Sequence, residues 1–310
     1  MICSAGHCFD ACIEAKPNCP NLDNLICFDE VSPDMRRRAE AAGLKVWGMR
    51  EVEAVGAKNP KEHHPPGPED IMTFCFTSGT TGDPKGALVT HKNIASNFSG
   101  VVRSSGWHPL PSDVHLSYLP LPHIFERVVQ YALITQACAM GFYQGDTQKI
   151  VEDLIELRPT VFPSVPRLLN RIYDKLIGGV KEAGGIKQKL FELAFDQKLQ
   201  NLRSDGSLTH FLWDRLVFSK IKDKVGLDRV RIMISGSAPI SGHVMEFLRV
   251  VFGVPVCEGY GQTENAAAAF ITNTNDATIG HVGHPVSCNE PVLLKKNSRN
   301  FRVSREMREK

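Results

Sequence analysis

Short apolar runs and longer amphipathic segments alternate along the chain from residue 114 to residue 258. The apolar runs predict strands at 114–121, 159–165, 230–235 and 254–258. Helical spacing of apolar residues predicts helices at 126–135, 147–157, 166–176 and 241–253, with two more between 186 and 226. Alternation of this kind restricts the fold to an α/β domain, in which helices cover both faces of a mostly parallel sheet.

Three residues mark expected helix ends. Pro166 suits the first position of a helix, because its fixed φ is helical and its missing N–H would have no partner there. Ser241 is a typical N-cap, and Gly253 a typical stop. An additional strand is expected at 24–30.

The segment TSGTTGDPKG, residues 77–86, concentrates hydroxyls and glycines around a single cation. Glycines let backbone N–H groups approach an anion, hydroxyls add donors, and a lysine supplies a point charge. This composition predicts a polyphosphate site. Its expected residues are Thr77, Ser78, Gly79, Thr80, Thr81, Gly82 and Lys85.

The segment is not a P-loop. That motif has glycine before its lysine and serine or threonine after it, and it continues into a helix. Here Pro84 precedes Lys85 and Gly86 follows it, and the flanks 71–77 and 86–90 both read as strands. We therefore expect a phosphate-binding loop between two strands. A flexible hairpin without a ligand is the alternative.

Two polar, glycine-bearing segments each follow an expected strand: SGSAP at 235–239 and GYGQTE at 259–264. In parallel sheets, ligands bind beyond the carboxyl ends of the strands. Tyr260 could stack on a base, Thr263 could donate to a phosphate, and Glu264 could hold Mg²⁺ through a hard oxygen. Two ordinary strand-to-helix turns, with Glu264 favoured by a helix dipole, are the alternative. Together with the phosphate-type loop, the segments predict a nucleotide site.

Length and charge exclude several classes of protein. With 310 residues and 42% hydrophobic content, the chain can bury the cores of about two domains. A net charge of +2 gives no general attraction to nucleic acid, so no nucleic-acid partner is expected. No apolar run approaches the ~20 residues that cross a bilayer, and no signal peptide is expected. Membrane association would be peripheral or would belong to other segments.

Nine cysteines, an odd and scattered number, indicate a reduced intracellular protein. Those near the start lack the spacing of a CxxC zinc pair, so no metal site is expected among them. The polar, proline-rich stretch 59–70 is interpreted as a linker, in which His63 and His64 are solvated.

Five segments carry a resemblance to a known family; in order they read TSGTTGDPKG, YLPLPHIFERV, VFPSVPRLLNRIYDKL, SGSAP and EGYGQTE. They resemble the AMP-forming acyl-CoA synthetases of the adenylate-forming, AMP-binding superfamily, and in detail the long-chain fatty-acid–CoA ligases. The resemblance covers roughly residues 10 to 290. It implies the central part of such an enzyme's N-terminal domain, truncated at both ends and without the small C-terminal domain.

The resemblance implies a ligase reaction in two steps. A long-chain fatty-acid carboxylate attacks the α-phosphate of MgATP, giving an acyl-adenylate and pyrophosphate, and coenzyme A thiolate then displaces AMP. The expected cofactors and co-substrates are therefore Mg²⁺, ATP and coenzyme A. The implied location is the cytosolic face of the endoplasmic reticulum, the mitochondrial outer membrane or the peroxisome. Acyl chain length and oligomeric state are not implied.

Position by position, the resemblance also implies roles for residues. Thr77 to Lys85 would cradle the departing pyrophosphate, Thr263 would contact the α-phosphate, and Glu264 would hold Mg²⁺. His123 would lie near the carboxylate and the mouth of an acyl channel; a strand-end histidine bonded to backbone is the alternative. The residues expected to enclose the nucleotide are Gly236, Ser237, Ala238, Gly259, Tyr260 and Gly261.

These assignments divide the chain into three parts. Residues 1–70 are expected to be a partial N-terminal region with its linker, and 71–290 an AMP-binding core. Residues 291–310 are expected to be a basic, disordered tail outside the family pattern. Two functions remain open: a long-chain fatty-acid–CoA ligase core, or a non-catalytic protein that binds nucleotide or a partner.

Overall fold

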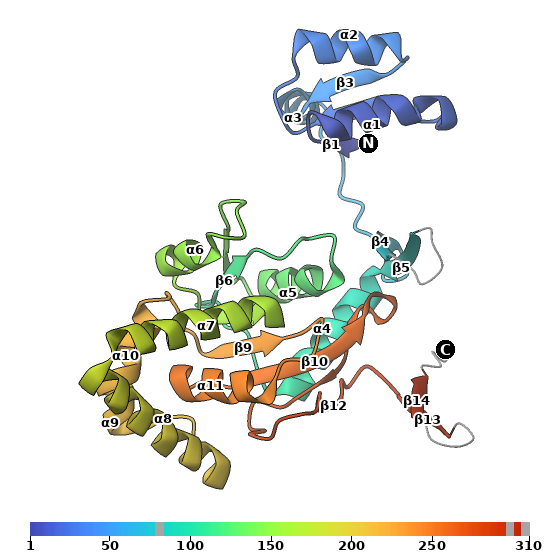
Figure 1. Ribbon diagram of the computed structural model, residues 1–310. Coiled ribbons are helices and arrows are strands. Elements are labelled where there is room, and N and C mark those ends of the chain that lie inside the picture. Colours follow the sequence, from blue (N-terminus) through green and yellow to red (C-terminus); the bar gives the residue numbers. More distant parts are fainter. Residues whose placement is uncertain (78–83, 296–300, 305–310) are drawn as a thin grey trace. The chain divides into compact units, whose positions relative to one another are not determined.

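The computed structural model describes residues 1–77, 84–295 and 301–304 (Figure 1). The chain divides into two compact units, Met1–Pro65 and Pro66–Lys310. Within the described ranges, no helix is both long and apolar enough to cross a bilayer.

The first unit is a small α/β layer. Its three strands, β1 (Ile2–Cys3), β2 (Asn24–Cys27) and β3 (Lys45–Gly48), form a parallel sheet in the order β1-β2-β3. Its helices are α1 (His7–Ala15), α2 (Pro33–Ala41) and α3 (Met49–Lys58), with a 3₁₀ turn η1 at Lys16–Asn18. Phe9, Leu25 and Val46 are in its buried core. The strand expected at 24–30 is present but ends at Cys27.

The second unit begins with an antiparallel hairpin. Its strands are β4 (Ile71–Thr77) and β5 (Lys85–Thr90), paired so that Thr77 lies opposite Lys85. The prediction that the phosphate-type loop joins two strands is thereby confirmed. Helix α4 (His91–Ser105) follows directly, and the Thr90 side chain caps it by accepting from the Asn93 N–H at 3.2 Å.

The main sheet has seven strands in the order β12-β11-β10-β9-β8-β6-β7. Five of them run parallel; the strands are β6 (Val114–Ser117), β7 (Ala139–Phe142), β8 (Val161–Ser164), β9 (Ile232–Ser235) and β10 (Val256–Gln262). The other two, β11 (Ala267–Ile271) and β12 (His284–Pro285), are antiparallel. A separate hairpin pairs β13 (Val292–Lys295) with β14 (Phe301–Ser304).

The remaining helices join these strands (Figure 1). They are α5 (Ile124–Thr135), α6 (Ile150–Leu157), α7 (Pro166–Ala183), α8 (Gly185–Asp205), α9 (Phe211–Trp213), α10 (Ser219–Asp223) and α11 (Gly242–Phe252). A π-turn, η2 (Asp214–Phe218), connects α9 to α10, and a 3₁₀ turn, η3 (Thr263–Asn265), follows β10.

Two cores lie on opposite faces of the sheet, because successive side chains of a strand point to opposite faces. Ile232 and Ile234 of β9 pack in a core that includes residues of α5, whereas Met233 between them packs in the core with α6, α7, α8 and α11. A largely parallel sheet with helices on both faces is what the alternating sequence predicts, and the α/β fold class is confirmed.

Several details differ from prediction. The strand expected at 254–258 continues to Gln262, because beyond Glu258 it pairs with the antiparallel β11. GYGQ is therefore part of a strand, and only Thr263–Asn265 forms a turn. Ser241 occupies the N-cap of α11, but its side chain makes no capping hydrogen bond. Gly253 ends α11 in the left-handed conformation at φ 62°, as expected.

Candidate functional site

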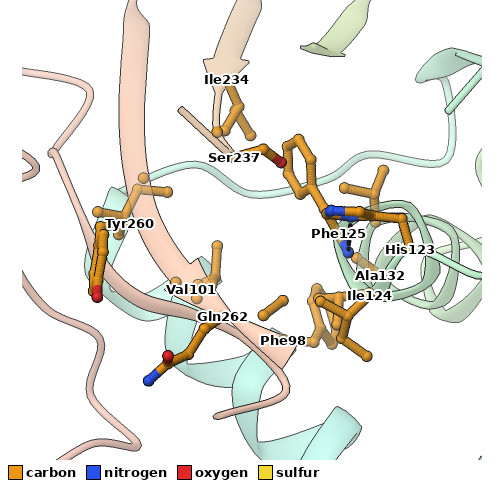
Figure 2. A pocket seen from close by; sticks show the side chains of 18 of the residues that line it. Phe98, Val101, His123, Ile124, Phe125, Ala132, Ile234, Ser237, Tyr260 and Gln262 are labelled. Carbon is orange, nitrogen blue, oxygen red and sulfur yellow. Dashed lines mark hydrogen bonds between the residues drawn. The ribbon is translucent and has the colours of Figure 1, made fainter. Parts of the chain in front are cut away.

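A pocket of about 180 Å³ opens in the second unit at the carboxyl ends of β9 and β10 (Figure 2). Helices α4 and α5 and strand β11 complete its walls. Its lining consists of Phe98, Val101, Trp107, His123, Ile124, Phe125, Val128, Val129, Ala132, Ile234, Ser235, Gly236, Ser237, Gly259, Tyr260, Gly261, Gln262, Thr263, Ala267, Ala268 and Ile271. One part of this lining is polar and rich in glycine, and the other is almost wholly apolar.

The residues after β9 form one wall. The parallel pairing of β9 with β10 reaches Ser235 opposite Glu258, so Gly236 and Ser237 lie just past the paired ends. The Gly236 N–H donates to the Ser164 carbonyl at 3.3 Å. Ser237 adopts φ 72°, the left-handed region that is uncommon for a residue with a side chain. A Cβ added at Gly236 would lie 3.4 Å from the Phe125 ring, in ordinary van der Waals contact with it.

The opposite wall is the distal half of β10. Here the pairing with β11 shifts register between Tyr260 and Gly261, a β-bulge that redirects the strand. Gly261 permits this approach, because a Cβ there would lie only 1.5 Å from the Ala267 carbonyl oxygen. The Tyr260 side chain is half exposed, with its ring centroid 6.3 Å from that of Phe270. Figure 2 shows Tyr260 and Gln262 across the pocket from His123 and Phe125.

His123 enters the pocket from the start of α5. It is the N-cap of that helix, and its Nδ1 accepts from the Phe125 N–H at 3.2 Å (Figure 2). Because Nδ1 acts as the acceptor, the neutral ring carries its proton on Nε2. His123 is thus bonded to the backbone and also lines the pocket, and its expected place near a fatty-acid carboxylate stays a prediction.

A buried polar cluster holds the first turns of α5 against β6. Oε1 of Glu126 accepts from the Ser117 hydroxyl at 2.7 Å and from the Gln130 side-chain amide at 3.2 Å, and it lies 3.3 Å from His115 Nε2. Glu126 and His115 are fully buried. Since Glu126 lies one turn beyond His123, the cluster fixes the part of α5 that lines the pocket.

Hydrogen bonds connect the β4–β5 hairpin to the start of α5 and the residues before it. The Cys75 thiol donates to the Pro122 carbonyl at 3.1 Å, and the Arg127 guanidinium donates to Thr73 Oγ1 at 2.7 Å. Strand β5 also contacts the turn η3. Lys85, the exposed first residue of β5, therefore belongs to an element that packs on Thr263–Asn265. The Thr77 hydroxyl donates to the Lys85 carbonyl at 3.4 Å.

Seven of the predicted site residues meet in the pocket lining: His123, Gly236, Ser237, Gly259, Tyr260, Gly261 and Thr263. Four others, Thr77, Lys85, Ala238 and Glu264, are described but are not part of that lining. Ser78, Gly79, Thr80, Thr81 and Gly82 lie outside the described residues. The roles predicted for all these residues stay predictions.

The apolar part of the pocket was not predicted from the sequence. Phe98 and Val101 come from α4, and Val128, Val129 and Ala132 from α5. Their helical spacing was the available signal, but spacing shows only that a helix face is apolar. Two buried polar atoms of the lining, Trp107 Nε1 and Ser235 Oγ, have no hydrogen-bond partner among the described residues. They are donors that a ligand could satisfy.

No group of three or more His, Cys, Asp or Glu side chains in the described part of the chain is arranged to hold a metal ion. Mg²⁺ bound with a nucleotide needs no such cluster, because one or two carboxylates and the substrate phosphates suffice. Glu264 offers a hard carboxylate in η3, beside the strand that begins with Lys85. This donor set fits Mg²⁺ held jointly with phosphates.

The fold is shared with solved adenylating domains. One is the A-PCP didomain of carboxylic acid reductase from Segniliparus rugosus, determined in complex with AMP. It aligns with a TM-score of 0.62 and 24% identity, covering 84% of this chain and 35% of that chain. The described part of the chain therefore shares the fold of that domain.

The model of the AMP-binding enzyme family matches residues 6–303, and the chain belongs to that family. It is 46% identical over 272 residues to long-chain-fatty-acid–CoA ligase 5 of Rattus norvegicus, covering 87% of this chain and 39% of the relative. It is 42% identical over 284 residues to long-chain-fatty-acid–CoA ligase 1 of Homo sapiens, covering 91% and 40%. The chain thus spans about two fifths of the length of these relatives.

Proposed function

We propose that this chain carries the nucleotide- and acyl-binding core of an AMP-forming long-chain fatty-acid–CoA ligase, with residues 71–290 as that core. The observation that carries the proposal is that a polar lining and an apolar lining meet in one pocket. A polar, glycine-rich rim around Ser237, Tyr260 and Thr263 continues into an apolar interior between α4 and α5. A fatty acyl-adenylate also has a polar part and an apolar part. The polar part is adenosine with its phosphate, the apolar part is the acyl chain, and the bond between the acyl carbonyl group and the phosphate joins them.

The polar rim suits the adenosine half. Tyr260 presents an aromatic face, and Gly236 and Gly259 leave room for a flat ring close to the backbone. Ser237 and Thr263 add hydroxyl donors at the two ends of the rim. In the proposal, the base lies between the segments 236–238 and 259–261, and Thr263 contacts the α-phosphate.

The apolar interior suits the acyl half. Phe98, Val101, Val128 and Ala132 offer no polar group, so a hydrocarbon chain there would exchange water for apolar contact at ~0.8 kcal/mol per methylene group. His123 lies at the boundary between the two halves. Its Nε2–H can donate to the fatty-acid carboxylate and orient one oxygen toward the α-phosphorus.

In the first step, that carboxylate oxygen forms a bond to the α-phosphorus, and the bond from this phosphorus to the bridging oxygen of pyrophosphate breaks. The products are the acyl-adenylate and pyrophosphate. Residues 77–85 would receive the departing pyrophosphate, with Lys85 offsetting its charge. Glu264 would hold Mg²⁺, which when bound supplies charge neutralisation at the phosphates. Coenzyme A thiolate would then attack the acyl carbonyl and release AMP.

The alternative is a non-catalytic protein that binds a nucleotide in the same pocket. A protein that only binds a nucleotide would not need an apolar interior that continues from the nucleotide-binding rim. An intracellular membrane surface as the place of action is part of our proposal, since long-chain fatty acids partition into bilayers.

Fatty-acid-dependent exchange of labelled pyrophosphate into ATP tests the proposal. The purified chain should exchange pyrophosphate with palmitate present, and at most a few per cent as fast with acetate or with no acid. A rate of pyrophosphate exchange that is the same with and without fatty acid would contradict the assignment of the apolar interior to the acyl chain. Binding of ATP without exchange would favour the non-catalytic alternative.

A further inference from the structure

Asn97 is a buried amide side chain in the middle of α4, where asparagine is uncommon because it is mostly found at the surface of proteins. Only 2% of the residue is exposed. Ile94, three residues earlier, and Val101, four residues later, lie on the same side of the helix and pack in apolar cores. A buried amide costs free energy unless its polar atoms are hydrogen-bonded, so the Asn97 side chain needs partners within the fold.

The Asn97 side chain makes three hydrogen bonds, and all of them go to the backbone that follows β10. Its Nδ2 donates to the Asn265 carbonyl at 3.3 Å and to the Ala268 carbonyl at 2.7 Å. Its Oδ1 accepts from the Ala268 N–H at 3.2 Å. These bonds use both donors of the amide and its oxygen. They connect α4 to the end of the turn η3 and to the beginning of strand β11.

Two residues with positive φ lie between the points where Asn97 is bonded. They are Ala266, with φ 58°, and Ala267, with φ 99°. Such backbone is unfavourable for a residue with a side chain, because the Cβ comes too close to the carbonyl oxygen. It persists only where the surrounding structure holds it. Asn97 bonds the residue before this pair and the residue after it, so it holds the chain on both sides of the strained pair.

The strained pair directly follows the turn η3, which contains Thr263 and Glu264. The Ala266 N–H donates to the Thr263 carbonyl at 3.1 Å, so the first strained residue closes this turn. Thr263 lines the pocket, and η3 contacts the strand that begins with Lys85. The direction in which η3 presents its side chains therefore depends on the backbone that Asn97 holds.

We propose that Asn97 is a positioning residue of the nucleotide site. Through its three hydrogen bonds it holds η3 in the conformation in which Thr263 contacts the α-phosphate and Glu264 holds Mg²⁺. The inference rests on the proposed function, from which these two contacts are taken. Asn97 itself is not part of the pocket lining. Loss of its bonds should therefore weaken the contacts with phosphate and metal and leave the contacts with the base, at Ser237 and Tyr260, in place.

Calorimetric titration of the purified chain with two ligands, MgATP and adenosine, tests this role. Both compounds carry the base, but only MgATP carries phosphates and the metal ion. Asn97→Ala should bind MgATP at least about 10-fold more weakly than the parent chain does, and should bind adenosine within about twofold of the parent. A general loss of stability would weaken the binding of both ligands alike. The difference between the two ligands therefore separates positioning from structural support.

Asn93→Ala is the matched control. Asn93 lies one turn earlier on α4, and its Oδ1 accepts from the Thr90 N–H at 3.0 Å. Its replacement should lower the melting temperature, because a bond at the start of the helix is lost, and should leave the affinity for both ligands within about twofold of the parent. Hydrogen–deuterium exchange should show the amide of Ala268 exchanging at least about 10-fold faster in Asn97→Ala than in the parent or in Asn93→Ala.

Two further variants complete the test. Adding Ala266→Gly to Asn97→Ala should raise the affinity for MgATP about fivefold above that of Asn97→Ala, since glycine adopts positive φ without a Cβ in the way. Where Asn97→Ala does not yield folded protein, Asn97→Asp takes its place with the same expected difference between the ligands. Aspartate keeps the volume of the side chain and the acceptor for the Ala268 N–H, but it lacks both donors.

The inference is overturned if Asn97→Ala binds MgATP as the parent does, if it loses both ligands to the same extent, or if Ala266→Gly restores nothing. A parent chain that binds neither ligand would refute the nucleotide site, and the role of Asn97 with it. Failure of the proposed function gives a different result. The variants would then differ in MgATP affinity as expected, but the parent would not exchange pyrophosphate in response to a fatty acid.

Discussion

At the scale of single residues, the positions of the His123 and Lys85 side chains are fixed in different ways. His123 is oriented by a hydrogen bond from the backbone of the helix that it caps, so its ring position follows from the start of α5. Lys85 is exposed at the first position of β5, and its location depends on the hairpin that carries it. Sequence alone could propose both residues, but only the folded chain places one of them in the pocket.

Lys85 is the residue whose charge the proposed reaction needs most. Lys85→Ala should lower the rate of fatty-acid-dependent pyrophosphate exchange by about 10²-fold or more, because a preorganised positive charge next to the leaving pyrophosphate is lost. Lys92→Ala is the matched control. Lys92 is also an exposed lysine of this unit, but it pairs with Glu69 at 2.9 Å, and its loss should change the rate less than about twofold. Equal effects of the two substitutions would remove Lys85 from the site.

At the scale of elements, the pairing of β10 with β11 shapes one wall of the pocket. The local pattern AAAFI at 267–271 gives little indication of a strand, and no strand was predicted there from the sequence. The strand forms because β10 continues past its parallel partner β9 and offers an edge to the returning chain. The formation of such a strand depends on tertiary pairing, which the periodicity of the local sequence does not indicate.

Alanine substitutions at two glycines of β10 distinguish the effect of disturbing this pairing from the effect of adding a methyl group elsewhere in the strand. Gly261→Ala places a Cβ 1.5 Å from the Ala267 carbonyl oxygen, so β10 and β11 must move apart. We expect a loss of about 3 kcal/mol or more in the free energy of unfolding, measured by urea denaturation. At Gly259 the nearest atom would be 3.5 Å away, and Gly259→Ala should cost less than about 1 kcal/mol. Similar losses at both positions would show that the bulge is not as described.

Asp113 joins the amino-terminal ends of β6, β8 and β9. It is buried and accepts hydrogen bonds from the Arg231 guanidinium, from the Thr160 hydroxyl at 2.7 Å and from the Leu110 N–H at 2.7 Å. Burial alone would raise the pKa of this carboxyl, but the hydrogen bonds and the charge of Arg231 outweigh it, and the pKa lies below its usual value. The ionised group therefore stabilises the fold.

The sign of this effect sets its pH dependence. A carboxyl with a lowered pKa contributes its stabilisation fully above the unfolded pKa, about 3.9, and loses it as the pH falls through the folded value. Asp113→Asn should lower the free energy of unfolding by about 3 kcal/mol at pH near 7, and the difference should shrink below about pH 4. Asp34→Asn, which alters the exposed pair of Asp34 with Arg37, is the control, with an expected change under about 0.5 kcal/mol. A difference that is independent of pH down to about pH 3 would contradict this role.

At the scale of the whole molecule, the sequence was most informative about regular elements. Alternation from β6 onward predicts the parallel sheet and its two helical layers, because burial on both faces leaves continuous apolar runs in the strands. It also indicates Tyr260, Thr263 and Ser237 as rim residues, since polar segments after such strands gather at one edge. The apolar interior could not be predicted, because Phe98 and Ala132 lie on different helices and become neighbours of the rim only in the folded unit.

In the proposed function, one pocket receives both the adenosine and the acyl half of a fatty acyl-adenylate. Calorimetric titration of the purified chain with non-hydrolysable acyl-sulfamoyl adenosines, one carrying a palmitoyl and one an acetyl group, measures whether both halves bind there. We predict that the palmitoyl compound binds at least about 100-fold more tightly, since only a few buried methylene groups at ~0.8 kcal/mol each are needed for that ratio. Equal affinities for the two compounds would show that the acyl chain lies outside the apolar interior, and the proposed function would then be wrong.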